Sequence, residues 1–235
     1  MTEELCATDA YLRSCEAVVL AASPGGVVLD RTVFSARGGG QPGDVGVLRW
    51  EGGQVRVVDT VRRDGEVLHL LEGEAPPVGV PAVAEIDWER RHLLMRTHTA
   101  LHALSAIVFR DHGAKVTGGN MEPGAARMDF ELERISQDFG LEVEAKLNAE
   151  LARDRPVRVR FLPRAEALAD PELIRTKVNL LPEHIDPIRV IEIEGLDRQA
   201  DGGTHVRSTA EVGRVRVVRT ESKGRGFKRM RIELA

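Results

Sequence analysis

Hydrophobic and polar positions follow two different patterns along the chain, and the change falls near residue 87. Before it, stretches rich in Val and Leu are separated by glycine-containing turns, and they cover residues 15–22, 27–34, 45–51, 55–62 and 67–71. Short apolar stretches broken by Gly and Asp-Gly turns are typical of antiparallel strands. We therefore expect a small antiparallel sheet or barrel over residues 1–86. Residues 74–81, rich in proline, are interpreted as a linker or stiff crossover.

After residue 87 the spacing becomes helical. Residues 88–112 contain neither Gly nor Pro, and four apolar residues recur at intervals of seven, three and four: Leu94, Leu101, Leu104 and Val108. This spacing predicts a helix that begins after Asp87 and ends before Gly113. Residues 87–235 are taken as the second domain.

The rest of the second domain mixes one more long helix with strands. Apolar residues four apart predict a helix over 137–153, with Ser136 as its N-cap and Pro156 as its end. A short helix is expected at 164–169, and strands are expected at 126–130, 157–161, 188–193, 214–219 and 227–234. These patterns indicate an α+β protein.

Charged residues are distributed unevenly along the chain. Apolar residues make up 42% and charged residues 30%, and the net charge of −4 argues against a protein that binds polyanions over its whole surface. From His205 to Ala235, however, nine Lys or Arg face three Glu, so this segment carries +6 and the remainder −10. A basic end suits contact with a phosphate backbone, and a solvated strand face explains it equally well from charge alone.

Compartment signals point to a cytoplasmic protein. Cys6 and Cys15 are too few and too far from the histidines to suggest a disulfide framework or a metal site. The N-terminus has no basic segment followed by an apolar one, so no signal peptide is expected. Since no run of about 18 apolar residues occurs, no membrane span is expected either.

Candidate metal ligands lie in the second domain. His98 and His102 are four residues apart on the predicted helix and therefore share one face, and Asp201 and His205 flank two glycines and a threonine in a tight loop. Imidazole and carboxylate groups are zinc ligands, and four is the usual number. Because His-Glu-x-x-His is absent, the metalloprotease arrangement is excluded. The other histidines have no partner at a telling spacing and are interpreted as structural or surface residues: His69, His92, His112 and His184.

A glycine-rich motif, Gly-Gly-Gly-Gln-Pro-Gly-Asp, covers residues 38–44. Its glycines allow close approach of backbone N–H groups to a ligand. No Lys-Ser or Lys-Thr follows and no helix opens after it, so it is neither a P-loop nor a dinucleotide-binding motif. A wide β-turn is the simpler interpretation. Gln41 offers an amide that both donates and accepts hydrogen bonds.

Five stretches in order resemble the AlaX-type alanyl-tRNA editing proteins, free-standing relatives of the editing domain of alanyl-tRNA synthetase. They are the glycine motif at 38–44, His-Thr-Ala-Leu-His at 98–102, Arg-Met-Asp-Phe at 127–130, Asp-Arg-Gln-Ala-Asp-Gly-Gly-Thr-His at 197–205 and Glu-Ser-Lys-Gly-Arg-Gly at 221–226. The length resembles the middle-sized class. The resemblance implies an N-terminal β-barrel-like domain and a C-terminal α/β sandwich in which an antiparallel sheet packs on helices, as in alanyl- and threonyl-tRNA synthetase editing domains.

The resemblance also implies a reaction. The family hydrolyses the ester that joins a wrongly attached serine or glycine to alanine tRNA. It implies zinc bound by His98, His102, His205 and the residue four before the last histidine, which is a cysteine in the family and Asp201 here. A carboxylate is a harder ligand than a thiolate, so other divalent metals compete with zinc. A site of three histidines with Asp201 beside it is the alternative.

Further roles follow from this hypothesis. Gln41, His98 and His102 are expected to act in catalysis. Substrate contacts are assigned to Thr32, Gly39, Gly40, Gln41 and Thr204, and a serine hydroxyl would be recognised by Gln41 or Thr32. Alanine-tRNA phosphates are assigned to Arg225, Lys228 and Arg229. The sequence leaves the oligomeric state undetermined, and a monomer is compatible with it.

Two alternatives stay open from the sequence. The first is a tRNA-binding paralogue whose catalysis was impaired when the zinc cysteine was lost. The second is a metallohydrolase of small esters that does not need RNA. Metal analysis with deacylation of serine-charged alanine tRNA distinguishes the first from the editing enzyme, and activity on a free aminoacyl ester with no benefit from tRNA would indicate the second.

Overall fold

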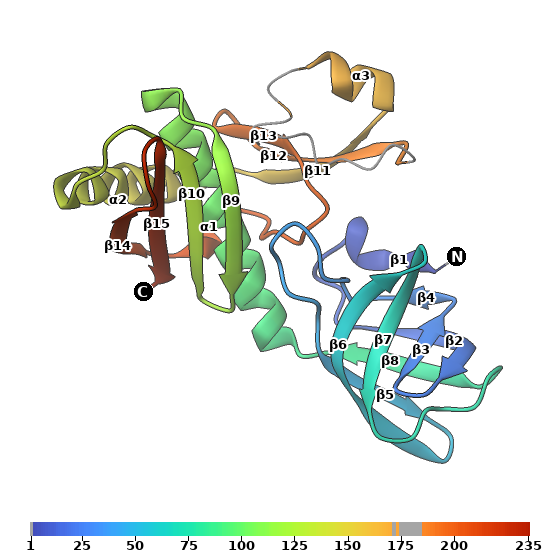
Figure 1. Cartoon of the computed structure of the whole chain (residues 1–235). Helices are drawn as coiled ribbons and strands as arrows, with labels where there is room; N and C mark the ends of the chain where they lie inside the picture. The colour runs from blue at the N-terminus through green and yellow to red at the C-terminus, as the bar shows by residue number, and fades with distance from the viewer. Residues whose placement is uncertain (1, 171–172, 174–184) are drawn as a thin grey trace. The chain divides into compact units, whose positions relative to one another are not determined.

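The structure is a computed structural model that describes residues 2–170, 173 and 185–235 (Figure 1). Contacts divide the chain into two compact units, Met1–Leu93 and Leu94–Ala235. Helix α1 (Trp88–His112) begins in the first unit and continues in the second. Its bounds are those predicted from the sequence, because this stretch has no Gly or Pro and ends at Gly113, whose φ is +64°.

The first unit is a closed barrel of six antiparallel strands. Their order around the barrel is β2-β3-β7-β6-β5-β8. The strands are β2 (Ser14–Ser23), β3 (Gly26–Leu29), β5 (Gly46–Trp50), β6 (Gly53–Arg63), β7 (Glu66–Glu72) and β8 (Pro81–Ile86). Apolar side chains that alternate along these strands fill the interior, among them Val19, Leu29, Leu48, Val57 and Leu71. Two short strands, β1 (Glu3–Glu4) and β4 (Arg31–Thr32), pair in parallel outside it.

The strand expected at 27–34 was wrong in its extent, and strand β8 was not predicted. The strand expected at 27–34 is interrupted, because Asp30 leaves the ladder and its Oδ1 accepts hydrogen bonds from the backbone of Val18 and Arg31. Residues 74–80 connect β7 to β8, as the interpretation of a linker or crossover required, and β8 then closes the barrel between β2 and β5. Residues of β8 alternate between exposed and buried along the whole strand.

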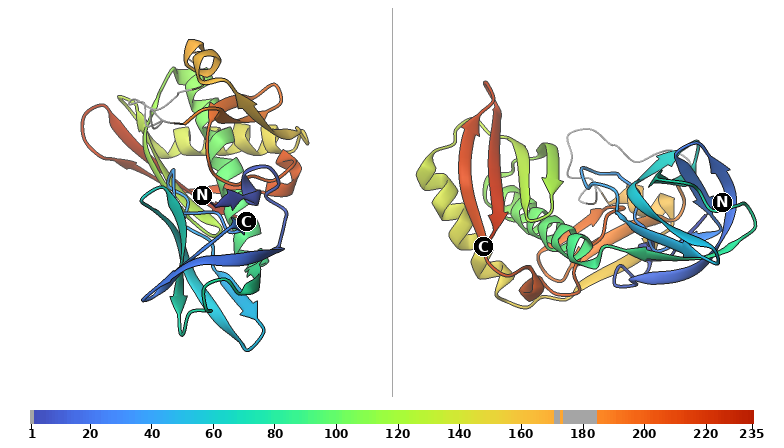
Figure 2. Two further views of the ribbon diagram at one scale, coloured as in Figure 1. Left: turned by 90° about the vertical axis from the view of Figure 1, so that its right-hand side faces the viewer. Right: turned by 90° about the horizontal axis from the view of Figure 1, so that it is seen from below.

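The second unit holds a four-stranded antiparallel sheet in the order β14-β15-β10-β9. Its strands are β9 (Val116–Glu122), β10 (Ala125–Glu131), β14 (Val215–Ser222) and β15 (Phe227–Leu234). Helix α2 (Gln137–Leu151) packs against β14 (Figure 2). The predicted Ser136 cap is confirmed, since its hydroxyl accepts from the backbone N–H of Phe139 at 3.0 Å. The helix ends at Leu151, two residues earlier than predicted and five residues before Pro156, so this proline is not what ends it.

A smaller sheet leads into the predicted ligand loop. It has the order β11-β12-β13, with β11 (Val157–Leu162), β12 (Ile188–Ile193) and β13 (Asp197–Ala200), and α3 (Arg164–Ala169) follows β11. The sequence did not reveal β13 or β9. The α+β class, with a barrel and antiparallel sheets packed on helices, is confirmed.

The middle of α1 is buried on every side. All residues from 97 to 108 are buried, including three of the four apolar residues whose spacing predicted the helix. This burial takes His98 and His102 out of bulk water. No helix in the described part of the chain is long and apolar enough to cross a membrane.

Candidate metal centre

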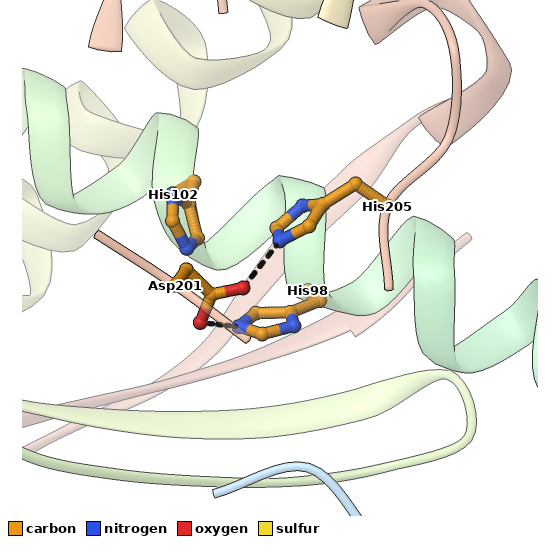
Figure 3. Close-up of side chains that lie close together, drawn as sticks. All are labelled: His98, His102, Asp201 and His205. Atoms are coloured by element: carbon orange, nitrogen blue, oxygen red, sulfur yellow. Dashed lines mark hydrogen bonds and ion pairs between the residues drawn. The ribbon is translucent and has the colours of Figure 1, made fainter. Parts of the chain in front are cut away.

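Four predicted ligands converge in the second unit. His98 and His102 project from successive turns of α1, and Asp201 and His205 come from the loop after β13 (Figure 3). One potential ligand atom from each side chain lies within 4.8 Å of the others. The ring centroids are 5.1 Å apart for His98 and His102, 4.3 Å for His98 and His205, and 4.6 Å for His102 and His205.

Hydrogen bonds behind the imidazoles fix which nitrogen faces the centre. Nδ1 of His102 lies 2.9 Å from Oδ2 of Asp197, whose buried carboxylate also accepts from the amide of Gln199. Nδ1 of His205 lies 3.1 Å from the hydroxyl of Thr99. Both rings therefore carry their second nitrogen, Nε2, toward the other ligands. A carboxylate behind a histidine is the usual support of a metal ligand, because it fixes the tautomer and raises basicity.

The loop that carries Asp201 is held by its own backbone and by the side chain of Arg189. Oδ2 of Asp201 accepts from the N–H of Gly203 at 2.7 Å, and one guanidinium nitrogen of Arg189 donates to the carbonyl oxygens of both residues at 2.9 and 2.8 Å. Arg189 comes from β12, so the smaller sheet sets the position of the loop. A turn fixed in this way presents its carboxylate without further reorganisation.

Burial determines the protonation of the cluster. It lowers the pKa of His98 to about 4, and it lowers the pKa of His205 well below the ordinary value. Burial acts to raise the pKa of Asp201, but the neighbouring imidazoles outweigh it and hold that pKa well below its ordinary value. At neutral pH His98 and His205 are therefore neutral and Asp201 is ionised, which is the state in which these groups bind a metal ion.

The donor set fits a divalent ion. Nε2 of His205 lies 3.0 Å from Oδ2 of Asp201, and Nε2 of His98 lies 3.6 Å from Oδ1. Ligands about 2.0–2.1 Å from a tetrahedral zinc ion are roughly 3.3 Å from one another, which falls between these two distances. Three nitrogens and one oxygen suit zinc, and the carboxylate also admits harder divalent ions.

The glycine motif of the first unit forms a tight turn. Gly38 and Gln41 exchange backbone hydrogen bonds of 3.1 and 2.9 Å, and Gly39 and Gly40 between them have φ values of +57° and +86°. Two such values in succession are strained for most residues, and glycine adopts them readily. The Gln41 side chain is buried, as is Thr204 beside the last ligand.

Thr32 has partners within the barrel. Its hydroxyl lies 2.8 Å from Nε2 of His69 and accepts from the N–H of Phe34 at 3.0 Å, and it has no exposed surface. His69 Nδ1 lies 3.2 Å from the carbonyl oxygen of Val27, which only accepts, so Nε2 accepts from Thr32. This bonding argues against the predicted contact between Thr32 and a substrate.

The predicted phosphate contacts differ in their surroundings. Lys228 is 5% exposed, and its ammonium donates to the carbonyl oxygen of Gly224 at 2.8 Å. Arg229 is bound by both oxygens of Asp129 at 2.6 and 2.8 Å. Only Arg225 of the three is exposed. Lys228 lies on the inward face of β15, which the alternation of that strand already required.

The sequence reasoning missed the residues that support the ligands. Asp197 and Thr99 contact the imidazoles from behind, and Arg189 holds the loop. Asp197 begins the stretch that carries Asp201, but it is 95 residues from His102 in the sequence, so no local pattern indicated that the two are in contact. Of the remaining histidines, His92 stacks on Trp88 and His112 is exposed, whereas His184 lies outside the described residues.

Comparison with known proteins assigns the class of the chain. Residues 188–231 match the threonyl and alanyl tRNA synthetase second additional domain, and residues 8–90 match the class II (A) tRNA synthetases. The first match covers Asp201 and His205, and the second covers the barrel. The fold and the cluster thus define a protein of the synthetase editing-domain class.

Full-length relatives narrow this class. The chain is 38% identical over 233 residues to the alanyl-tRNA editing protein AlaX-M of Saccharolobus solfataricus, and 35% identical over 237 residues to that of Methanosarcina barkeri, with 98% of each chain covered in both pairs. It is 40% identical over 228 residues to the alanine–tRNA ligase of Pyrobaculum arsenaticum, but spans only 25% of that ligase. The chain belongs to the AlaX-M family of alanyl-tRNA editing proteins.

Proposed function

We propose that this protein is a metal-dependent hydrolase that removes wrongly attached serine or glycine from alanine tRNA. The observation that carries the proposal is the convergence of His98, His102, Asp201 and His205 in a chain of the AlaX-M family. Family membership supports aminoacyl-tRNA deacylation, and the cluster supports a metal ion as its cofactor.

The four side chains would hold the ion, which would polarise the ester carbonyl or lower the pKa of a water molecule. Asp197 fixes the tautomer of His102, because its carboxylate only accepts, and Thr99 holds the ring of His205 in position, so little reorganisation precedes the reaction. Because the cluster is buried, water reaches it only in small numbers, and electrostatic interactions there are strong. An aminoacyl ester is labile, and positioning contributes much of the acceleration.

Discrimination against alanine is assigned to the glycine motif. Serine is larger than alanine, so exclusion by size cannot favour serine. A polar group that bonds the serine hydroxyl would be left unpaired by alanine, which penalises alanine strongly. We assign this contact to Gln41, with Gly39 and Gly40 shaping the turn that presents it. Thr204, next to the ligand His205, is assigned to the aminoacyl group.

The experiment is deacylation of alanine tRNA charged with serine, glycine or alanine, after the enzyme has been loaded with zinc. We expect hydrolysis of the first two and at least about 100-fold slower hydrolysis of the third. His98→Ala should abolish it, and His112→Ala, which removes an exposed histidine from the same helix, should not. Equal rates in His98→Ala and wild type would contradict the proposal.

Two outcomes would point to other functions. Asp201 in place of the family cysteine favours an impaired tRNA-binding paralogue, and this function would appear as tRNA binding without hydrolysis. A hydrolase of small esters would cleave an aminoacyl ester as fast as the charged tRNA, with no dependence on salt.

A further inference from the structure

One face of the β14-β15-β10-β9 sheet carries a row of arginines in register. Arg127 of β10 pairs with Arg231 of β15, and Arg231 pairs with Arg219 of β14. Directly paired residues point to the same face of a sheet. The inward face carries buried Met128 and Met230, so the arginines belong to the outward face. Three neighbouring strands thus place three guanidinium groups side by side over roughly 10 Å.

Two carboxylates beside the row each bind two arginines. Asp129 accepts from Arg229 and, at 3.1 Å, from Arg127. Glu221 accepts from Arg231 at 3.1 Å and forms an ion pair of 2.9 Å with Arg219.

These contacts lower the pKa of both carboxylates, chiefly through Arg229 at Asp129 and Arg231 at Glu221. Four guanidinium groups therefore face two negative charges. This network holds the arginines in place and, within itself, contains two more guanidinium groups than carboxylates.

The arginines of the row keep donors for a ligand. The side chains of Arg127, Arg231 and Arg219 are 32%, 42% and 70% exposed. Arg231 and Arg219 contact Glu221 through Nε, and among the described residues their terminal nitrogens form no hydrogen bond. A guanidinium that is anchored at one edge and open at the other is suited to bidentate binding of phosphate.

A hollow of about 220 Å³ beside the row is lined by Arg127 and Arg231, and also by Glu122 and Glu233. It lies at the end of the sheet where the β9–β10 turn meets α1, because the N–H of Gly124 donates to the hydroxyl of Thr97 at 3.1 Å. Thr97 is the residue before His98. The turn at this end of the sheet therefore lies beside the helix that carries His98 and His102.

The geometry points to a binding surface for the phosphodiester backbone of RNA on the row Arg127, Arg231 and Arg219, with the acceptor end of a tRNA as the occupant. The choice of RNA rests on the proposed function. It is supported by the excess of guanidinium groups and by Phe227, which is 41% exposed on the same face and offers a ring for base stacking. This surface replaces Lys228 and Arg229 as the main predicted phosphate contacts, because those two are bound within the protein.

The test measures binding of an uncharged RNA stem-loop with a single-stranded 3′ end, by fluorescence anisotropy over a range of salt. In Arg219→Gln/Arg231→Gln, we expect the Kd to rise about tenfold and the slope of log affinity against log salt to fall by about two. Arg158→Gln/Arg160→Gln is the matched control, since it removes two exposed arginines that pair with Glu194 and Glu192 on the other sheet. This control should bind as wild type does.

A variant that removes a negative charge should have the opposite effect on RNA binding, which loss of folding could not produce. Glu233 lies among the exposed residues that line the hollow, so Glu233→Gln should tighten RNA binding. The proposed surface is refuted if the two double variants weaken RNA binding equally. Polyglutamate serves as an anion without phosphate, and the surface is also refuted if Arg219→Gln/Arg231→Gln loses affinity for polyglutamate but not for RNA. Because the RNA is uncharged, failure of deacylation would refute the proposed function without affecting this test.

Discussion

Asp197 accepts a hydrogen bond of 2.9 Å from Nδ1 of His102, and the side chains of the two residues are 0% and 9% exposed. The pair joins the first residue of β13 to the middle of α1. It therefore couples the smaller sheet to the helix that carries two of the four ligands. Strand β13 also leads directly to Asp201, so one short strand supports the cluster from two sides.

Asp197→Asn should weaken metal binding while leaving the four ligands in place. The amide can still accept from His102, but it carries no charge to raise the basicity of the imidazole. Loss of such a partner costs about 10- to 100-fold in metal affinity. A competition titration with a zinc chelator measures it. Asp170→Asn, which alters a carboxylate paired with exposed Arg198, is the control, and an affinity equal to wild type in Asp197→Asn would refute this role.

Asp201→Cys should change the preference of the site. A thiolate is softer than a carboxylate, so we expect zinc affinity to rise by about tenfold or more and affinity for manganese to fall. Competition between the two ions measures the ratio in both proteins. Asp170→Cys introduces a thiol away from the cluster and should leave the ratio unchanged. If Asp201→Cys also leaves it unchanged, Asp201 does not bind the ion.

The barrel should lose stability in acid through His69. Burial lowers the pKa of His69 to about 4 from 6.5. Above pH 6.5 the ring is neutral in both states and contributes no pH dependence. Between pH 6.5 and 4 the unfolded chain binds a proton that the folded chain excludes, so the free energy of unfolding falls by about 3 kcal/mol.

Urea unfolding at a series of pH values compares wild type with His69→Gln, which places a polar amide at this position and does not titrate. The difference between the two curves isolates His69 from the histidines of the metal centre. Parallel curves from pH 7 to pH 4 would show that His69 is not responsible.

The buried ion pair between Arg91 and Asp44 should be essential to the first unit. The two side chains are 0% and 1% exposed, and Arg91 also donates to the carbonyl oxygen of Val33 at 2.7 Å. Arg91→Met leaves Asp44 buried without its counterion, which costs about 3–5 kcal/mol. Arg49→Met, which breaks the exposed pair with Glu85, should cost at most about 1 kcal/mol. Similar losses in urea unfolding for both variants would contradict this difference.

The sequence predicted elements whose signal is local. Helix α1 could be delimited because 25 residues without Gly or Pro end at a glycine that closes the helix. Strand β8 was missed because it begins at Pro81, close after other prolines, which usually indicate a loop. Proline lacks a backbone N–H, but it is tolerated at the first residue of a strand. Strand β13 has four residues, too few to show a period.

The candidate site divides in the same way. His98 and His102 share a helix turn, and Asp201 and His205 share a loop, so each pair was visible in the sequence. The contact of Asp197 with His102 depends on how β13 packs on α1, which no local pattern encodes. Charge counting located the basic strands, but only the register of β10, β14 and β15 showed which arginines lie side by side.

Metal content tests the central claim most directly. Wild type, His98→Ala, His205→Ala and His112→Ala are incubated with zinc, passed through a desalting column and analysed for metal and protein. Wild type and His112→Ala should retain about one zinc ion per chain, and the other two should retain a small fraction of it. If wild type retains no zinc, or if His98→Ala and His205→Ala retain as much as wild type, the four side chains do not form a metal centre.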